Sequence, residues 1–213
     1  MKVRTFSSVV ASVALAGSAL AVTAPAQADD HKLGTRSLAK VLAADGSGFD
    51  KTAGDFDILD NAVSAVLAAK PKSAVAVLAD GKTALTAFAP TDGAFRRLVE
   101  DLTGSRYHRE RKIFNTLADT AGIDTIESVL LYHVVPGATV TYRQAKASGG
   151  AKLDTALEGA TLRVRVRDGK RVFLADADKN DPNARVLPRL KNINHGNRQI
   201  AHGISWVLRP ADL

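Results

Sequence analysis

The sequence predicts a single α+β domain, and two observations lead to this class. Apolar residues recur at helical spacing in the first half of the chain, as in Leu59, Val63 and Val66, whereas from Thr161 onward they alternate with period two, as in a strand. Because helices and strands do not alternate regularly along the chain, a parallel α/β architecture is not expected. With 213 residues, of which 46% are hydrophobic and 24% charged, the chain can bury a core of its own.

The N-terminus has the pattern of a secretory signal peptide. Lys2 and Arg4 precede an apolar run over residues 9–24, and the Ala-Gln-Ala sequence at 26–28 is a small-x-small cleavage site. An uncleaved membrane anchor is the alternative, since the run is nearly long enough to span a bilayer. We expect cleavage, which leaves no membrane span in the mature protein.

The chain then divides into three parts. We expect a signal peptide over residues 1–28, a polar lead-in segment over 29–54 and the folded domain over 55–213. Without Lys2 and Arg4, the excess of basic over acidic residues is 27 − 22 = +5. A surplus this small is compatible with attraction to acidic polymers but does not indicate a specific nucleic-acid-binding domain.

The first half of the domain contains most of the expected helices. The apolar spacing predicts a helix, a strand and two further helices, in the order 55–70, 85–89, 91–102 and 124–133. Thr91 or Asp92 can cap the second helix, and Asp124 with Glu127 resembles a capping box for the third. Pro136 is expected to close that last helix.

A β-hairpin is expected in the second half. Apolar residues alternate with arginines over residues 162–167, and Asp168-Gly169 is a strong two-residue turn signal. Such a turn pairs residues whose numbers sum to 337, which places Val164 opposite Phe173. In this pairing the arginines have apolar residues as their cross-strand neighbours. The side of the hairpin that carries the arginines is therefore expected to be only partly exposed to solvent.

The last strand is expected over residues 200–208, with both faces at least partly buried. His202 lies among apolar neighbours in this strand, so we interpret it as a core histidine that is satisfied by hydrogen bonds. Phe95 and Trp206 are the aromatic residues expected to be buried in the core.

The chain carries no recognisable catalytic motif. It has no cysteine, no nucleophile elbow, no phosphate-binding loop, no dinucleotide fingerprint and no His-Glu-x-x-His zinc motif. Residues 176–180 have the first ligand positions of a calcium loop, but Asp181 stands where the turn needs glycine and Leu187 where a bidentate glutamate belongs. We therefore expect no metal site and no cofactor, and a hydrolase is the least favoured class.

Basic residues gather in two places. One cluster includes Arg109 and Arg111, and the other includes Arg163, Arg165 and Arg167. Charge runs of this kind are usually solvated faces of a domain. The functional interpretation is a salt-sensitive contact with an anionic envelope polymer.

Three segments resemble one family, in the family's order. They are residues 85–95 (LTAFAPTDGAF), 130–137 (LLYHVVPG) and 200–210 (IAHGISWVLRP), and they are similar to the first signature, the Tyr-His segment and the closing signature of the fasciclin domain. The resemblance implies an α+β wedge of about seven strands packed with several helices, without a cofactor. It also implies an adhesive role in secreted and surface proteins.

The resemblance further implies partner-binding candidates at Tyr132 and His133. His133 shares a helix face with Val129 and Leu130, so we expect it to be structural and Tyr132 to be the better candidate for exposure. The expected function is a secreted, non-enzymatic adhesion module, extracellular or attached to the cell surface. Its expected partner is a cell-surface or matrix protein or an envelope polymer. The alternative is a carrier of an anionic or amphipathic small molecule or polysaccharide.

Overall fold

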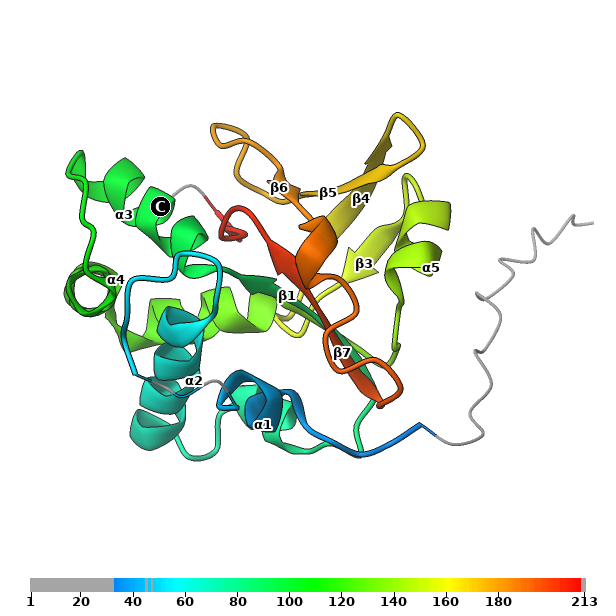
Figure 1. Cartoon of the computed structure of the whole chain (residues 1–213), viewed down its shortest axis with the longest axis horizontal. Helices are drawn as coiled ribbons and strands as arrows, with labels where there is room; N and C mark the ends of the chain where they lie inside the picture. The colour runs from blue at the N-terminus through cyan, green and yellow to red at the C-terminus, as the bar shows by residue number, and fades with distance from the viewer. Residues whose placement is uncertain (1–32, 45, 47, 212–213) are drawn as a thin grey trace, which may run out of the picture. The chain divides into compact units, whose positions relative to one another are not determined.

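The computed structural model describes residues 33–44, 46 and 48–211 (Figure 1). The signal peptide expected over residues 1–28 lies outside them. The helices are α1 (Leu38–Leu42), α2 (Asp57–Ala69), α3 (Asp92–Thr103), α4 (Glu110–Tyr132) and α5 (Tyr142–Ala147), with 3-10 turns at Ala74–Ala79 and Pro188–Leu190. The strands are β1 (Leu85–Pro90), β2 (Val134–Pro136), β3 (Lys152–Asp154), β4 (Thr161–Arg167), β5 (Arg171–Ala175), β6 (Ala184–Arg185) and β7 (Gln199–Ile204).

The strands of this part of the chain form two sheets. The first has the order β2-β1-β7, with β1 antiparallel to β2 and parallel to β7, and the second is the antiparallel sheet β3-β4-β5-β6. Figure 1 places α2, α3 and α4 on one side of the β1–β7 pair and the second sheet on the other. The mixed architecture and the seven strands confirm the predicted α+β class.

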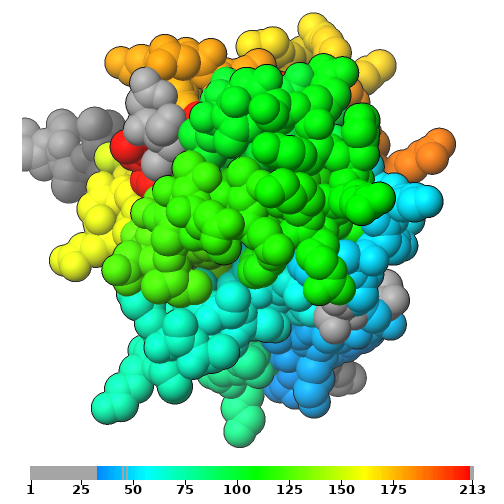
Figure 2. Space-filling view, turned by 90° about the vertical axis from the view of Figure 1, so that its left-hand side faces the viewer, coloured from blue at the N-terminus to red at the C-terminus, as the bar shows by residue number. Residues whose placement is uncertain are grey.

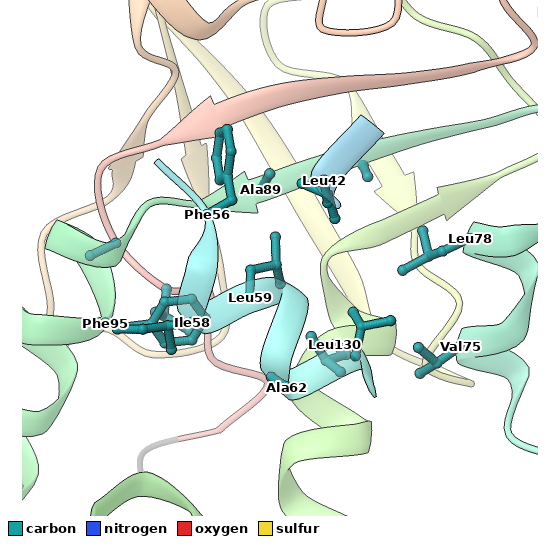
Figure 3. Close-up of a cluster of buried hydrophobic side chains, with 14 of the residues drawn as sticks. Leu42, Phe56, Ile58, Leu59, Ala62, Val75, Leu78, Ala89, Phe95 and Leu130 are labelled. Carbon is teal, nitrogen blue, oxygen red and sulfur yellow. The ribbon is translucent and has the colours of Figure 1, made fainter. Parts of the chain in front are cut away.

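Two apolar clusters hold these layers together. In the first, Ile58, Leu59 and Ala62 of α2 meet Ala89 of β1 and Leu130 of α4 (Figure 3). The second lies between β1, β2 and the second sheet. Its fully buried members include Tyr132, Leu162, Leu174, Ile204 and Leu208. The end of α4 therefore lies between two cores, which decides where its side chains can point.

Part of the expected lead-in segment belongs to the domain core. Leu38 and Leu42 of α1 are buried, and the Leu38 amide donates a hydrogen bond of 2.8 Å to Oε1 of Gln199 in β7. The described residues from 33 onward fall in one compact unit with the rest of the domain. The folded part thus begins well before residue 55, because the apolar residues of α1 pack against the 3-10 turn at 74–79 and against β7.

The first three expected elements are confirmed as α2, β1 and α3. Asp92 does cap a helix, but the helix is α2: Oδ1 of Asp92 accepts a 3.0 Å hydrogen bond from the Ile58 amide. Thr91 is the N-cap residue of α3 without a side-chain cap bond. An acidic side chain from the start of one helix therefore satisfies an amide at the start of another.

The helix expected over 124–133 is the second half of a longer element. α4 begins at Glu110 and is broken at Gly122, whose φ of 74° lies in a region that favours glycine. Asp124 and Glu127 form ion pairs with Lys70. The expectation that Pro136 closes the helix was wrong. The helix ends at Tyr132 because residues 134–136 pair with β1.

The hairpin forms, but its expected register was wrong by one residue. Val164 lies opposite Leu174, and Arg165 opposite Phe173, so paired numbers sum to 338. The loop has three residues, since Arg171 is already paired with Arg167. Asp168 and Gly169 both have positive φ, and the next residue closes the turn with a hydrogen bond back to the Arg167 carbonyl. A three-residue loop of this kind shifts the pairing from the one a two-residue turn would impose.

Strand β7 is buried on both faces, as expected, but it ends at Ile204. Phe95 is buried, whereas Trp206 is only partly buried and has the guanidinium of Arg97 5.6 Å from its ring centroid. Full burial of Trp206 was a wrong expectation, because the residue follows the end of the strand and does not continue its alternation.

Among the described residues, no helix combines the length and the apolar character that a membrane-spanning helix needs.

Candidate functional site

Tyr132 is buried, so the expectation of exposure was wrong. Its exposed fraction is 0%, and it sits at the last position of α4 within the second apolar cluster. Its hydroxyl donates to the Thr161 carbonyl at 3.0 Å and accepts from the Ala177 amide at 3.1 Å. Burial raises the pKa of the Tyr132 hydroxyl to about 12, with the Asp176 carboxylate adding to the rise. The side chain ties the helix to both ends of the β4–β5 hairpin.

His133 is structural, as expected. Its exposed fraction is 4%, and both ring nitrogens have backbone partners. Nδ1 lies 2.6 Å from the Val129 carbonyl, which can only accept, and Nε2 lies 2.9 Å from the Leu208 amide, which can only donate. The ring is therefore neutral, with its proton on Nδ1. Burial lowers the pKa of His133 to about 4.

The Tyr-His segment thus links parts of the fold and offers no side-chain surface to a partner. His133 holds the chain near Leu208, and Tyr132 holds the hairpin. The helical spacing placed His133 on an apolar face correctly. It could not show that the opposite face, with Tyr132, packs against the second sheet, because that contact joins residues 29 positions apart.

The arginines of β4 form an exposed face. Arg163, Arg165 and Arg167 all point away from the core, while Leu162 and Val164, which alternate with them, are buried. We call this surface the arginine face. Alternate residues of a strand lie about 7 Å apart, so the three guanidinium groups are attached at regular intervals.

Neighbouring strands add further cations to the arginine face. Lys152 is paired with Arg163, and Arg185 is paired with Phe173, the residue opposite Arg165. The Arg167 guanidinium lies 4.8 Å from the Phe173 ring centroid, a cation–π contact that supports it above the sheet. The face therefore combines a row of cations with a half-buried aromatic ring.

The second basic cluster lies elsewhere on the molecule. Arg109 and Arg111 are exposed at the start of α4, where the Arg111 guanidinium is 5.2 Å from the Phe49 ring centroid. Figure 1 shows the α3–α4 region and the β4–β5 hairpin at different sides of the fold, and Figure 2 shows residues of α3 and α4 covering most of one face. The structure does not bring the two clusters into one patch.

Neither of the two inner histidines can act as a general base. In His202, Nε2 lies 2.8 Å from the Val140 carbonyl and Nδ1 accepts from the Asn192 amide at 3.2 Å. Burial lowers the pKa of His202. This confirms the interpretation of His202 as a satisfied core residue and removes it from the arrangement that a hydrolase would need.

The apolar pocket between α3 and α4 is too small for an amphipathic ligand. It is lined by residues such as Phe95, Phe114 and Ile126, and its volume is about 50 Å³. Sites for drug-sized ligands have volumes of several hundred Å³. A shallower surface hollow of about 480 Å³ lies beside Arg96, Arg97 and Arg106. A drug-sized ligand would therefore not fit in the apolar pocket between α3 and α4.

The fold and these surfaces define an α+β domain with a basic sheet face. The fasciclin domain model matches residues 59–210, which is well over half of the chain, so the protein belongs to the fasciclin domain family. Domains of this family are generally adhesion-related and non-enzymatic.

One similar solved structure supports the same fold. It is a FAS1 domain pair from the insect cell adhesion molecule fasciclin I, with 19% sequence identity and a TM-score of 0.50. The match covers 73% of this chain and 48% of that chain, so this protein spans about half the length of the domain pair. No curated protein matches.

Proposed function

We propose that the protein is a secreted, non-enzymatic adhesion module that binds an anionic cell-surface, matrix or envelope polymer through its arginine face. The observation that carries the proposal is the exposure of Arg163, Arg165 and Arg167 on one face of β4. Arginine binds carboxylate and phosphate groups through two parallel hydrogen bonds, so a row of arginines suits a polymer with repeated acidic groups.

The proposed contact needs no movement of the fold. The arginine face is already exposed, and its backbone is held by pairing with β3 and β5. Two cations at this surface have competing contacts. Arg171, which is paired with Arg167, forms an ion pair with Asp168, and Arg163 donates to the Gly150 carbonyl at 3.4 Å. Arg165 and Arg167 have no carboxylate partner among the described residues, which leaves them available to a ligand.

Neutralising the arginine face should weaken binding strongly. We expect the triple variant Arg163→Gln, Arg165→Gln, Arg167→Gln to bind isolated envelope, or an immobilised acidic polysaccharide, about ten-fold more weakly than wild type at low salt. The wild-type interaction itself should decline as salt rises, because exposed charges are screened. Dissociation constants at two salt concentrations measure both effects.

The matched control also neutralises three positive charges, but at a surface away from the arginine face. Arg109→Gln, Arg111→Gln, Lys112→Gln neutralises three exposed cations at the start of α4. This variant should retain most of the affinity. Equal losses in both triple variants would mean that net charge alone drives the attraction, and the arginine face would then be excluded as the binding site.

A further inference from the structure

A cluster of three carboxylates is buried where the starts of three helices meet. Asp55 precedes α2, Asp92 is the first residue of α3 and Glu110 is the first residue of α4. Each contributes one carboxylate oxygen to a set in which all oxygens lie within 4.8 Å of one another. Asp92 is 0% exposed and Glu110 is 1% exposed. We call this group the carboxylate cluster.

The backbone satisfies only one oxygen of each buried acid. Oδ1 of Asp92 accepts from the Ile58 amide at 3.0 Å, and Oε2 of Glu110 accepts from the Asp50 amide at 2.6 Å. The remaining oxygens, Oδ2 of Asp92 and Oε1 of Glu110, are buried without a hydrogen-bond partner among the described residues, as is Oδ1 of Asp55. When the three acids are ionised, each therefore has an oxygen that lacks a donor, and a proton shared between Asp92 and Asp55 would satisfy that pair only.

No cation of the described chain compensates this charge. The ion pairs of the described residues involve other acids. Arg109 and Arg111 flank Glu110 in sequence, but both are exposed, and Arg111 lies over the Phe49 ring. Burial, together with the adjacent Asp55 carboxylate, raises the pKa of Asp92 to about 8, and burial also raises the pKa of Glu110.

The positive ends of the helix dipoles favour acids at these positions, but they do not supply the missing donors. Buried charges in proteins are normally paired with an opposite charge or coordinate a metal ion. Unpartnered oxygens on two side chains that are more than nine-tenths buried thus indicate that a positively charged ligand belongs among them.

We infer that the carboxylate cluster is a binding site for a divalent cation, calcium in particular. Calcium takes oxygen ligands at about 2.3–2.6 Å, so two oxygens on the same ion lie no more than about 5 Å apart, a condition that this cluster meets. Asp55 also belongs to a second acidic set, with Asp50 and Asp57, that meets the same distance limit. Asp50 is exposed, so this outer set gives the ion a route from solvent.

Calcium titration of the purified protein tests the inference directly. After dialysis against EDTA, isothermal titration with calcium chloride should show one saturable site per chain, with a dissociation constant of about 1 mM or below, the range of extracellular calcium modules. Calcium should also raise the thermal unfolding midpoint, because an ion that binds only the folded state stabilises it. Magnesium should be less effective, since it demands shorter and more regular coordination.

Conservative variants assign the binding to the cluster. Asp92→Asn and Glu110→Gln should each weaken calcium binding at least about ten-fold and remove the thermal shift. Their matched controls, Asp119→Asn and Glu158→Gln, change exposed acids and should bind calcium as wild type does. In EDTA, Asp92→Asn should be no less stable than wild type, because the amide carries no charge beside Asp55 and Glu110 and keeps an oxygen acceptor for the Ile58 amide.

Two results would overturn the inference. One is the absence of saturable binding and of any thermal shift in wild type up to 10 mM calcium, a concentration about ten-fold above the expected dissociation constant. The other is equal calcium affinity in the cluster variants and their controls. If Asp92→Asn fails to fold, Asp55→Asn provides the same comparison at a half-buried position. The test does not involve the arginine face, so its outcome is independent of the proposed function.

Discussion

Replacing Arg209 by methionine is expected to lower the free energy of unfolding by about 3–5 kcal/mol, because it leaves the buried Asp178 carboxylate without its cation. The Arg209 side chain is 2% exposed and forms ion pairs with Asp101, Asp178 and Asp181. Its Nε lies 3.1 Å from Oδ2 of Asp178, whose side chain is 0% exposed. Methionine fills much of the same volume, so the variant mainly removes the charge.

The Arg209→Met substitution should remove contacts to two parts of the fold. Arg209 joins the C-terminal segment to α3 through Asp101 at 2.8 Å and to the loop between β5 and β6 through Asp178 and Asp181. The Arg209 amide also donates to Oδ2 of Asp176 at 2.9 Å, a backbone contact that the substitution preserves. Urea unfolding of wild type and variant, monitored by circular dichroism, gives the difference in free energy.

The control is an exposed ion pair of the same type. Arg106 contacts Glu100 at 2.7 Å, but its side chain is 67% exposed. Arg106→Met should leave the urea midpoint near that of wild type, since exposed pairs contribute little. In addition, Asp178→Asn combined with Arg209→Met should recover part of the lost stability. If Arg209→Met unfolds at the same urea concentration as Arg106→Met, the ion-pair group does not stabilise the fold.

This acidic loop shows why sequence patterns identified residues but not their roles. Asp176, Asp178 and Asn180 occupy the first ligand positions of a calcium loop, but Asp181 stands where glycine is needed, and the sequence therefore predicts a polar surface loop. Asp178 is in fact buried, because a cation 31 residues further along the chain lies against it. The misfit with a calcium loop was visible in the sequence, but the partner of these acids was not.

Patterns among residues close in sequence predicted the helices and strands whose position depends on those residues. The apolar periodicity located α2, β1 and α3 and the hairpin strands, because each of those faces a core. The first half of α4 was missed, and the hairpin register was off by one. A two-residue and a three-residue loop both fit Asp168-Gly169 followed by Lys170, and only the pairing of Arg167 with Arg171 distinguishes them.

The candidate site could be predicted only in part. The alternation of apolar residues and arginines along β4 correctly indicated that the arginines share one face of the strand, because successive side chains of a strand point to opposite faces. The buried state of Tyr132 and the carboxylate cluster were not predictable in this way. The three acids of the cluster lie at positions 55, 92 and 110, and they meet only because three helices begin at the same place. No sequence spacing encodes such a site.

Acidification is expected to destabilise the protein through His133. The pKa of His133 is about 4 in the folded protein, against about 6.5 in an unfolded chain. Between these values the unfolded state binds the proton more tightly, so stability is retained above pH 6.5 and falls as the pH decreases towards 4. The difference corresponds to about 3 kcal/mol at the acid end of this window.

The hydrogen bonds of the ring explain the direction of this effect. A second proton would have to sit on Nε2, which accepts from the Leu208 amide at 2.9 Å, so protonation would place two donors against each other. It would also put a charge in the core beside Leu130 and Val134, away from any described carboxylate partner. The charged ring is therefore incompatible with the packing of β2 against the C-terminal segment.

The contribution of His133 can be isolated by comparing pH profiles. Urea unfolding between pH 7 and pH 4.5 should show a steeper loss of stability in wild type than in His133→Gln, even though the variant is less stable at pH 7. The exposed His108 provides the control, because His108→Gln should reproduce the wild-type profile. Parallel profiles for wild type and His133→Gln would contradict the assignment of a neutral, buried His133. A steeper wild-type profile would mean that the Tyr-His segment makes the fold sensitive to acid through a core hydrogen bond, without any contact to a partner.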